Sequence, residues 1–432
     1  MGLIDTYRAP VDATVPRTEQ FNGIRIRPES LAELRVALFT GNYNYIKDGV
    51  SLTLNRLVDY LQRHDVPVLV IAPTGPSPAF APVGELLSVP SFPIPSRPEY
   101  RLSTGLPAKA CQRVQEFAPT LFHIAVPDVL GYRALCLAER WQVPVVASYH
   151  TRYDTYLKYY GLAALEKLGK SYLRNFYGRC RQIYPPSESM AAILREDGIS
   201  RPMRIWSRGV ETELFNPGRR SYAWRQSLGV ADDEVLVSYV GRLVKEKNTG
   251  LLVRIFDGLK RRGIPFRPMI VGNGPEEAVM RAALPDAIFA GFLHGEALAR
   301  AYASSDVFVF PSESETFGNV TLEAMASGVP AVCANASGSR SLVAEGETGF
   351  LVSAANEYGF IDRIATLAAR RELRLLMAAA ALERALHYRW DNVMSGLLSN
   401  YVDVIEETET VVVSRGARHP VPMQLSGTAA AD

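Results

Sequence analysis

The sequence contains few cysteines, the residues that would indicate a disulfide-bonded exported protein or a structural zinc site. Only four cysteines occur among its 432 residues, and no two of them form a CxxC pair. They stand far apart, at Cys111, Cys136, Cys180 and Cys333. This spacing favours reduced thiols in the cytosol over a disulfide framework or a zinc site.

Long apolar runs and an excess of charge are also missing. No run of about 18 apolar residues occurs, so we predict no membrane-spanning helix. The first 20 residues contain acids and prolines and no apolar core, which excludes a secretory signal. The net charge is only +2, so no global field favours nucleic acid as a partner. We expect a cytoplasmic protein, and attachment to a membrane surface stays open.

The length and the order of apolar runs predict two α/β domains. A chain of 432 residues is too long for one ordinary core. Apolar, strand-like runs alternate with helical patterns in two successive cycles, which begin at residues 34–40 and 234–242. Alternation of this kind is typical of parallel sheets covered by helices. We therefore predict two doubly wound, Rossmann-like domains whose sheets face each other across a deep cleft at the carboxyl ends of the strands.

Changes in composition set the expected boundaries, with a hinge near residues 205–217. We predict five segments: a polar extension over 1–32, a first domain over 33–205, a second domain over 206–388, a helix over 389–406 that crosses back to the first domain, and a tail over 407–432.

The most informative segment is DVFVFPSESETFGNVTLEAMASGVPAV, residues 306–332. It predicts a buried strand, a polar loop, and a helix that begins near Thr316–Asn319 and ends at Gly328. The backbone N–H groups of Phe317, Gly318 and Asn319 would be unpaired donors at the helix start, where glycine allows close approach. Such a site suits a diphosphate.

Two glutamates accompany this helix. Glu315 stands just before it and Glu323 lies in its second turn. Their carboxylates can accept hydrogen bonds from the hydroxyls of a sugar or a ribose. The alternative is that Glu315 caps the helix and Glu323 is a surface charge. The full context of strand, loop and helix favours the binding site.

Two cations follow the first strand of the second cycle, in YVGRLVKEKN (239–248). Arg242 and Lys247 could neutralise a diphosphate and the charge that develops on it as a leaving group. Pairing with Glu246 in a solvated charge run is the alternative. No acidic cluster with metal-ligand spacing is found, so we expect a metal-independent site without a cofactor.

The segment PSESETFGNVTLEAMASGVP resembles the signature of family 4 retaining glycosyltransferases, which have the GT-B fold. The likeness covers about residues 33–395. It implies that Glu315 holds hydroxyls of the donor sugar, that Glu323 holds the ribose, and that Thr316, Phe317, Gly318 and Asn319 meet the sugar and diphosphate through their backbone. Asn319 departs from the family pattern, in which an aliphatic residue is commoner.

The same resemblance assigns residues of the first domain, which would bind the acceptor. His150 ends the strand-like run VPVVASYH, and by resemblance it lies near the donor sugar and takes part in catalysis with Arg242, Lys247 and Glu315. Asp48 and Gly49 would face the donor phosphates, although many relatives have paired glycines there.

A basic stretch with interleaved aromatic residues runs from Arg152 to Tyr184. Such a segment can lie on an anionic membrane and lead an apolar acceptor to the active site. An ordinary solvated helix face is the alternative. We assign membrane and acceptor contacts to five of its cations: Arg152, Lys158, Lys167, Lys170 and Arg174.

The motifs predict transfer of a sugar from a nucleoside diphosphate, which we expect to be UDP, and the resemblance implies that the anomeric configuration is retained. SYHT (148–151) and YASSDVFVFPSESET (302–316) resemble the branch that glycosylates diacylglycerol and includes sulfoquinovosyltransferases. A glycolipid product, made peripherally on the inner face of the membrane, is the leading prediction. The alternatives are polysaccharide, lipid-carrier or small-molecule acceptors, a nucleotide-sugar epimerase of the same fold, and a non-catalytic sensor.

Overall fold

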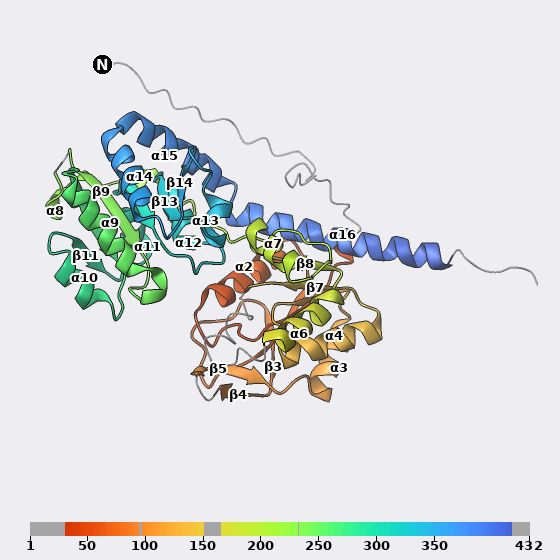
Figure 1. Ribbon diagram of the computed structural model, residues 1–432. Helices are drawn as coiled ribbons and strands as arrows, with labels where there is room; N and C mark the ends of the chain where they lie inside the picture. The colour runs from red at the N-terminus through yellow and green to blue at the C-terminus, as the bar shows by residue number, and fades with distance from the viewer. Residues whose placement is uncertain (1–30, 95–96, 151–165, 232, 417–432) are drawn as a thin grey trace, which may run out of the picture.

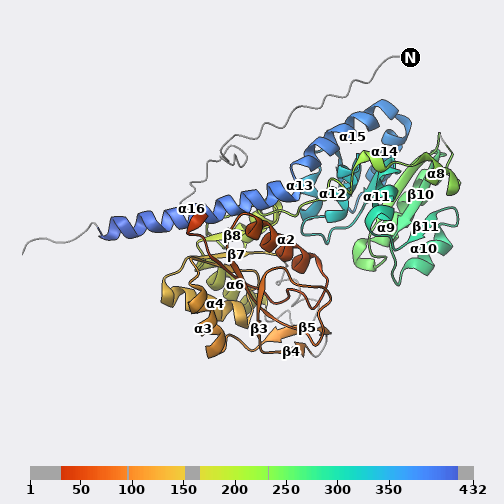
Figure 2. The same cartoon turned by 180° about the vertical axis from the view of Figure 1, so that it is seen from behind.

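The protein consists of two α/β domains and a long C-terminal helix (Figures 1 and 2). A computed structural model describes residues 31–94, 97–150, 166–231 and 233–416. Each domain is built on one six-stranded parallel sheet. The predicted fold class, with two parallel sheets in separate domains, is therefore confirmed.

The sheet of the N-terminal domain has the strand order β3-β2-β1-β6-β7-β8. The order reverses between β1 and β6, and ligand sites of open α/β sheets form beside such a point. The strands are β1 (Val36–Phe39), β2 (Val68–Pro73), β3 (Glu85–Val89), β6 (Leu121–Ile124), β7 (Val145–Ser148) and β8 (Gln182–Tyr184). The helices are α2 (Gly49–Arg63), α3 (Ala108–Phe117), α4 (Val129–Trp141), α6 (Glu166–Gly178) and α7 (Glu188–Glu196).

The C-terminal domain repeats this arrangement, with the order β11-β10-β9-β12-β13-β14. Its strands are β9 (Val235–Val240), β10 (Phe266–Val271), β11 (Ile288–Gly291), β12 (Val307–Phe310), β13 (Ala331–Ala334) and β14 (Gly349–Val352). Its helices are α8 (Tyr222–Ser227), α9 (Thr249–Arg261), α10 (Glu277–Ala283), α11 (Gly295–Ala303), α12 (Asn319–Ala326), α13 (Ser337–Leu342), α14 (Glu357–Ala369) and α15 (Arg371–Leu386), with short 3₁₀ turns η2 (Pro217–Arg219) and η3 (Lys245–Lys247).

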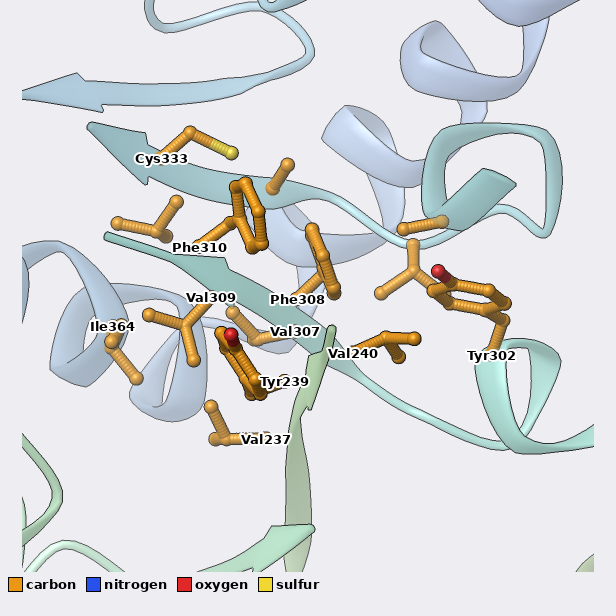
Figure 3. Close-up of a cluster of buried hydrophobic side chains, with 14 of the residues drawn as sticks. Val237, Tyr239, Val240, Tyr302, Val307, Phe308, Val309, Phe310, Cys333 and Ile364 are labelled. Carbon is orange, nitrogen blue, oxygen red and sulfur yellow. The ribbon is translucent and has the colours of Figure 1, made fainter. Parts of the chain in front are cut away.

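The central strands are apolar along their whole length because helices cover both faces of each sheet. All residues of β9 and of β12 are buried. Figure 3 shows this core around Tyr239, Phe308 and Phe310, and the rings of Tyr239 and Phe310 stack with centroids 5.8 Å apart. This packing fixes the loops that follow β9 and β12, where the predicted donor residues lie.

The two domains are joined by a linker near Val210 and by α16 (Trp390–Gly416), which Figure 1 shows running from the C-terminal domain along the N-terminal one. The Val210 N–H donates to the Tyr388 carbonyl at 2.8 Å, so the two crossings are hydrogen-bonded to each other. Apolar residues of α16, among them Leu398 and Tyr401, belong to the core of the N-terminal domain.

The end of α16 differs from the expected boundary. We predicted a helix over 389–406 and a tail from 407, whereas the helix continues to Gly416. Its buried face ends near Ile405, which is why the apolar periodicity of the sequence stops there. The helix itself continues through ETETVVV, residues 407–413.

Candidate active site

Lys247 and Glu315, which are 68 residues apart in sequence, meet at the carboxyl edge of the C-terminal sheet. The Lys247 ammonium pairs with the Glu315 carboxylate and donates to the Ser314 hydroxyl at 2.9 Å. Their side chains are 13% and 26% exposed, so the pair is partly withdrawn from water. η3 after β9 positions the lysine, and the loop between β12 and α12 positions the glutamate.

Arg242 also follows β9, but its side chain pairs with Glu246 and not with Glu315. Its side chain is 70% exposed and pairs with Glu246 at 3.1 Å, one helical turn away. The Tyr239 hydroxyl donates to the Arg242 carbonyl at 3.2 Å, which fixes the backbone of this turn. Contact of the Arg242 guanidinium with a diphosphate therefore stays a prediction, and it requires this exposed side chain to leave Glu246.

The start of α12 has no side-chain cap. The N-cap residue is Gly318, whose φ of +92° is in the left-handed region and which offers no side chain as a cap. Asn319 is exposed on the first turn, Thr316 is half-buried, and Phe317 is buried against Tyr388 with ring centroids 5.9 Å apart. Phe317 therefore anchors the loop and only its backbone is free for a ligand.

Two residues that sequence reasoning missed hold the Glu315 loop in place. The Ser337 hydroxyl donates to the Glu315 carbonyl at 3.0 Å. Gly338 packs so tightly that an added Cβ would lie 2.7 Å from Glu315 Cβ. The sequence signal was the ASGS turn after the predicted strand PAVCA, where small residues permit close approach.

Glu323 lies in α12 and is half-buried beneath this site. Its Oε2 accepts a hydrogen bond from the Tyr302 hydroxyl at 3.0 Å, and burial raises the pKa of Glu323 to about 7. Figure 3 shows Tyr302 projecting toward the core of the domain. We had not predicted Tyr302, which stands in the run YASSDVFVF.

The residues predicted near the donor phosphates in the N-terminal domain have different roles. Asp48 is the N-cap of α2: its Oδ1 accepts from the backbone of Val50 and Ser51, and its Oδ2 accepts from Asn42 at 3.0 Å. Its carboxylate is therefore occupied by the fold. Gly49 opens the helix with no atom within 4 Å of the position of a Cβ, so the space above it is free. Donor binding by both residues stays a prediction.

His150 follows β7 and is only 8% exposed. Its ring contacts Trp206 edge to face, with centroids 5.1 Å apart, and its Nε2 has no hydrogen-bond partner in the described part of the chain. Burial, with the charge of Arg208, holds the pKa of His150 well below its usual value, so the ring is neutral at pH 7. Its catalytic role stays a prediction.

Three of the five cations predicted to contact a membrane lie on α6. Arg152 and Lys158 lie outside the described residues. Lys167 and Arg174 are exposed on α6, whereas Lys170 is half-buried and pairs with Asp197 at 2.9 Å. None of the described helices combines the length and the apolarity needed to cross a membrane.

The described residues form no evident metal site. Within them, no group of three or more His, Cys, Asp or Glu side chains is placed to hold a metal ion. The four cysteines are unpaired, and two of them, Cys180 and Cys333, are buried.

Two family models match the chain in succession. "Glycosyltransferase Family 4" matches residues 47–214, and "Glycosyl transferases group 1" matches residues 221–384. The break between them falls in the linker that joins the two sheets.

Full-length relatives and solved structures agree. A GDP-mannose-dependent alpha-mannosyltransferase of Corynebacterium glutamicum is 33% identical, covering 89% of this chain and 92% of the relative. Sulfoquinovosyl transferase SQD2 of Arabidopsis thaliana is 34% identical over 84% of this chain and 72% of its own length. An alpha-monoglucosyldiacylglycerol synthase of Streptococcus pneumoniae is 24% identical over 69% and 70%.

The fold is that of a sucrose-phosphate synthase from Thermosynechococcus elongatus, with a TM-score of 0.64 at 17% identity, over 89% of this chain and 100% of that one. The motif around Glu315 and Glu323, the family models and the relatives all give the same answer. This chain is a glycosyltransferase and belongs to the family 4 glycosyltransferases of GT-B fold.

Proposed function

We propose that this enzyme transfers a sugar, with anomeric retention, from a nucleoside-diphosphate donor to the hydroxyl of diacylglycerol. The observation that carries the donor half is the Lys247–Glu315 pair beside the uncapped start of α12, with Glu323 one turn further along. One cation, free backbone donors and two carboxylates match a diphosphate flanked by a ribose and a sugar.

The proposed reaction follows from the charges at this edge of the sheet. Lys247, Arg242 and the backbone of 316–319 would stabilise the diphosphate as it leaves, because donors aimed at developing charge lower the barrier most. Glu315 would exchange its contact with Lys247 for sugar hydroxyls. The neutral His150 would approach the sugar from the N-terminal domain, and exclusion of water between the domains would suppress hydrolysis.

Relatives that are named for different sugars bear on the identity of the donor. One relative is named for GDP-mannose and another for transfer of sulfoquinovose. Our expectation of a UDP-sugar is retained, and GDP-mannose is the competing donor. The acceptor is inferred from the relative named as a diacylglycerol glucosyl synthase and from the exposed cations Lys167 and Arg174 on α6. We place the reaction on the cytoplasmic face of an anionic membrane.

A mass-spectrometric assay tests this proposal directly. Purified protein is given vesicles that contain diacylglycerol and a panel of UDP- and GDP-sugars, without added metal. We expect a new glycolipid from one donor, with the anomeric configuration of that donor. The variant Glu315→Ala is assayed beside the wild type. It should lose most turnover and keep its affinity for the nucleotide, because the proposed contacts of Glu315 are to the sugar.

The other outcomes separate the alternatives. Product on a soluble saccharide and none on diacylglycerol would contradict the lipid acceptor. Conversion of the donor sugar to its epimer without an acceptor would contradict transfer altogether. Equal, modest losses of turnover and of nucleotide affinity in Glu315→Ala would contradict the placement of the sugar.

A further inference from the structure

Arg208 lies in the linker between the domains, on a backbone that is held from both sides. The Trp206 N–H donates to the Pro185 carbonyl at 3.0 Å, and the Val210 N–H donates to the Tyr388 carbonyl at 2.8 Å. Between them, Gly209 packs on the ring of Trp390, where an added Cβ would lie 2.4 Å from a ring atom. The direction in which Arg208 leaves the linker is therefore fixed by the fold.

The guanidinium of Arg208 belongs to a half-buried residue. Within the described residues it makes no hydrogen bond and no ion pair. Burial lowers the pKa of Arg208 to about 10, so the charge is still present at neutral pH. Asp48 is the acid whose charge acts on it, but the Asp48 carboxylate is occupied by the start of α2 and by Asn42. Water screens a half-buried cation less than an exposed one, so an anion beside Arg208 would be held more strongly than at the surface.

Two buried ring nitrogens near Arg208 have no hydrogen-bond partner within the described residues. His150 Nε2 and Trp206 Nε1 are buried without a hydrogen bond in the described part of the chain, on side chains that are 8% and 3% exposed. The two rings touch, and the charge of Arg208 acts on His150. An indole nitrogen is only a donor, and a neutral imidazole can donate from Nε2. We call these three residues the Arg208 cluster.

We propose that the Arg208 cluster binds a negatively charged substituent, a carboxylate, sulfonate or phosphate, on one of the two reacting molecules and so selects acidic over neutral substrates. This inference rests on the proposed function. The diphosphate of the donor is assigned to the C-terminal domain, at Lys247 and α12. The Arg208 cluster instead joins the end of β7, through His150, to the linker between the domains, where the sugar and the acceptor would meet.

A binding experiment tests the cluster without requiring turnover. Wild-type protein saturated with UDP or GDP is titrated with methyl α-D-glucuronide and with methyl α-D-glucoside, which differ in one carboxylate, and binding is followed by saturation-transfer NMR. We expect about a tenfold preference for the glucuronide, the worth of one charge-assisted hydrogen bond. Arg208→Gln should abolish the preference, and Arg208→Lys should retain part of it.

Arg219→Gln is the matched control, because Arg219 is an exposed arginine that pairs with Glu296 at 3.2 Å. It should keep the full preference. Nucleotide affinity should stay within about twofold of wild type in all variants, since no phosphate contact is removed. No preference in the wild type, a preference that survives Arg208→Gln, or a loss of nucleotide affinity in that variant would each overturn the assignment. Failure of the wild type to bind any nucleotide would instead contradict the proposed function.

Turnover then identifies which molecule carries the anion. UDP-glucose is compared with UDP-glucuronate on a neutral acceptor, and diacylglycerol is compared with a diacylglycerol bearing a glucuronosyl headgroup on a neutral donor. Arg208→Gln should lower kcat/KM about tenfold more for the acidic member of one pair than for its neutral partner. Equal losses for acidic and neutral members of both pairs would overturn the proposal.

Discussion

Burial gives Glu323 a titration close to neutral pH, and this has consequences for binding and for stability. Glu323 is half-buried in α12, and within the described residues its carboxylate accepts one hydrogen bond, from the Tyr302 hydroxyl at 3.0 Å. Removal from water raises its pKa from 4.5 to about 7. A carboxylate that accepts two ribose hydroxyls must be ionised, because the protonated form has less acceptor capacity.

Nucleotide affinity and protein stability should therefore respond to pH in opposite directions. The folded protein keeps a proton on Glu323 up to about pH 7, whereas the unfolded chain releases it near pH 4.5. The free energy of unfolding should fall as the pH rises from about 4.5 to about 7 and then level off. Nucleotide affinity should rise about tenfold between pH 5.5 and pH 8 as the carboxylate ionises.

Calorimetric titrations of UDP and GDP, with thermal unfolding at the same pH values, check this pair of trends. Glu323→Gln should remove both, because the amide does not titrate. Glu277→Gln, which changes a carboxylate on α10 paired with Arg281, is the control and should keep both. A rise in affinity that persists in Glu323→Gln would assign the titration to another group.

At the scale of elements, α6 provides the surface on which membrane binding can be tested. Its buried side is anchored by Phe176 and Tyr177, and its exposed residues include Lys167, Leu168 and Arg174. A basic residue near an anionic bilayer contributes about 1 kcal/mol. Replacing Lys167 and Arg174 by Gln should therefore weaken binding to phosphatidylserine vesicles about 30-fold.

Vesicle co-sedimentation at two salt concentrations measures this loss. The difference from wild type should shrink between about 0.1 M and about 1 M salt, as the screening length falls from about 10 Å to about 3 Å. The double variant Lys260→Gln, Arg261→Gln removes the same charge from α9 and should bind as the wild type does. Equally weakened vesicle binding in both double variants would show that binding depends on the net charge of the protein and not on α6.

The elements that sequence predicted best are those with both faces buried. The apolar runs that contain β1, β2, β9 and β12 were predicted because a strand covered on both faces must be apolar throughout. The antiparallel pair β4 (Ser91–Ile94) and β5 (Arg97–Ser103) was missed, because it includes prolines and few of its described residues are fully buried.

The residues of the candidate site that lie within a local sequence motif could be predicted from the sequence. Glu315, Glu323 and Lys247 stand in recognisable strand–loop–helix segments, and the structure brings Glu315 and Lys247 together. Tyr302 and Arg208 were not predicted, because their importance depends on burial beside residues that are distant in sequence. Asp48 shows the reverse case: a polar residue at a sheet edge can be fully used by capping a helix.

At the scale of the whole molecule, the two crossings between the domains form one junction. The linker around Gly209 packs on Trp390 at the start of α16 and is hydrogen-bonded to residue 388. Arg56 of α2 pairs with Glu211 of the linker and lies over the Trp390 ring at 4.8 Å from its centroid. A pocket of about 350 Å³, whose lining includes Arg56, Glu211 and Trp390, lies beside the junction. The linker, α2 and α16 thus depend on one another, and loosening one should loosen the others.

Gly209→Ala tests this dependence. Its new methyl group would stand 2.4 Å from the Trp390 ring, so either the linker or α16 must move. Overpacking of this kind costs about 1–3 kcal/mol. Amide exchange in peptides that span 207–213 and 388–396 should therefore speed up together, by about 5- to 100-fold where local opening governs exchange.

Gly396→Ala is the matched control, since the same methyl group at that position in α16 has no atom within 4 Å. Alanine also favours a helix interior over glycine, so exchange in 388–396 should stay the same or slow slightly. Mass spectrometry of both variants under native conditions compares the two segments. Faster exchange in 207–213 alone would show that the linker and the start of α16 open independently. If they form a single junction, exchange should change in both segments.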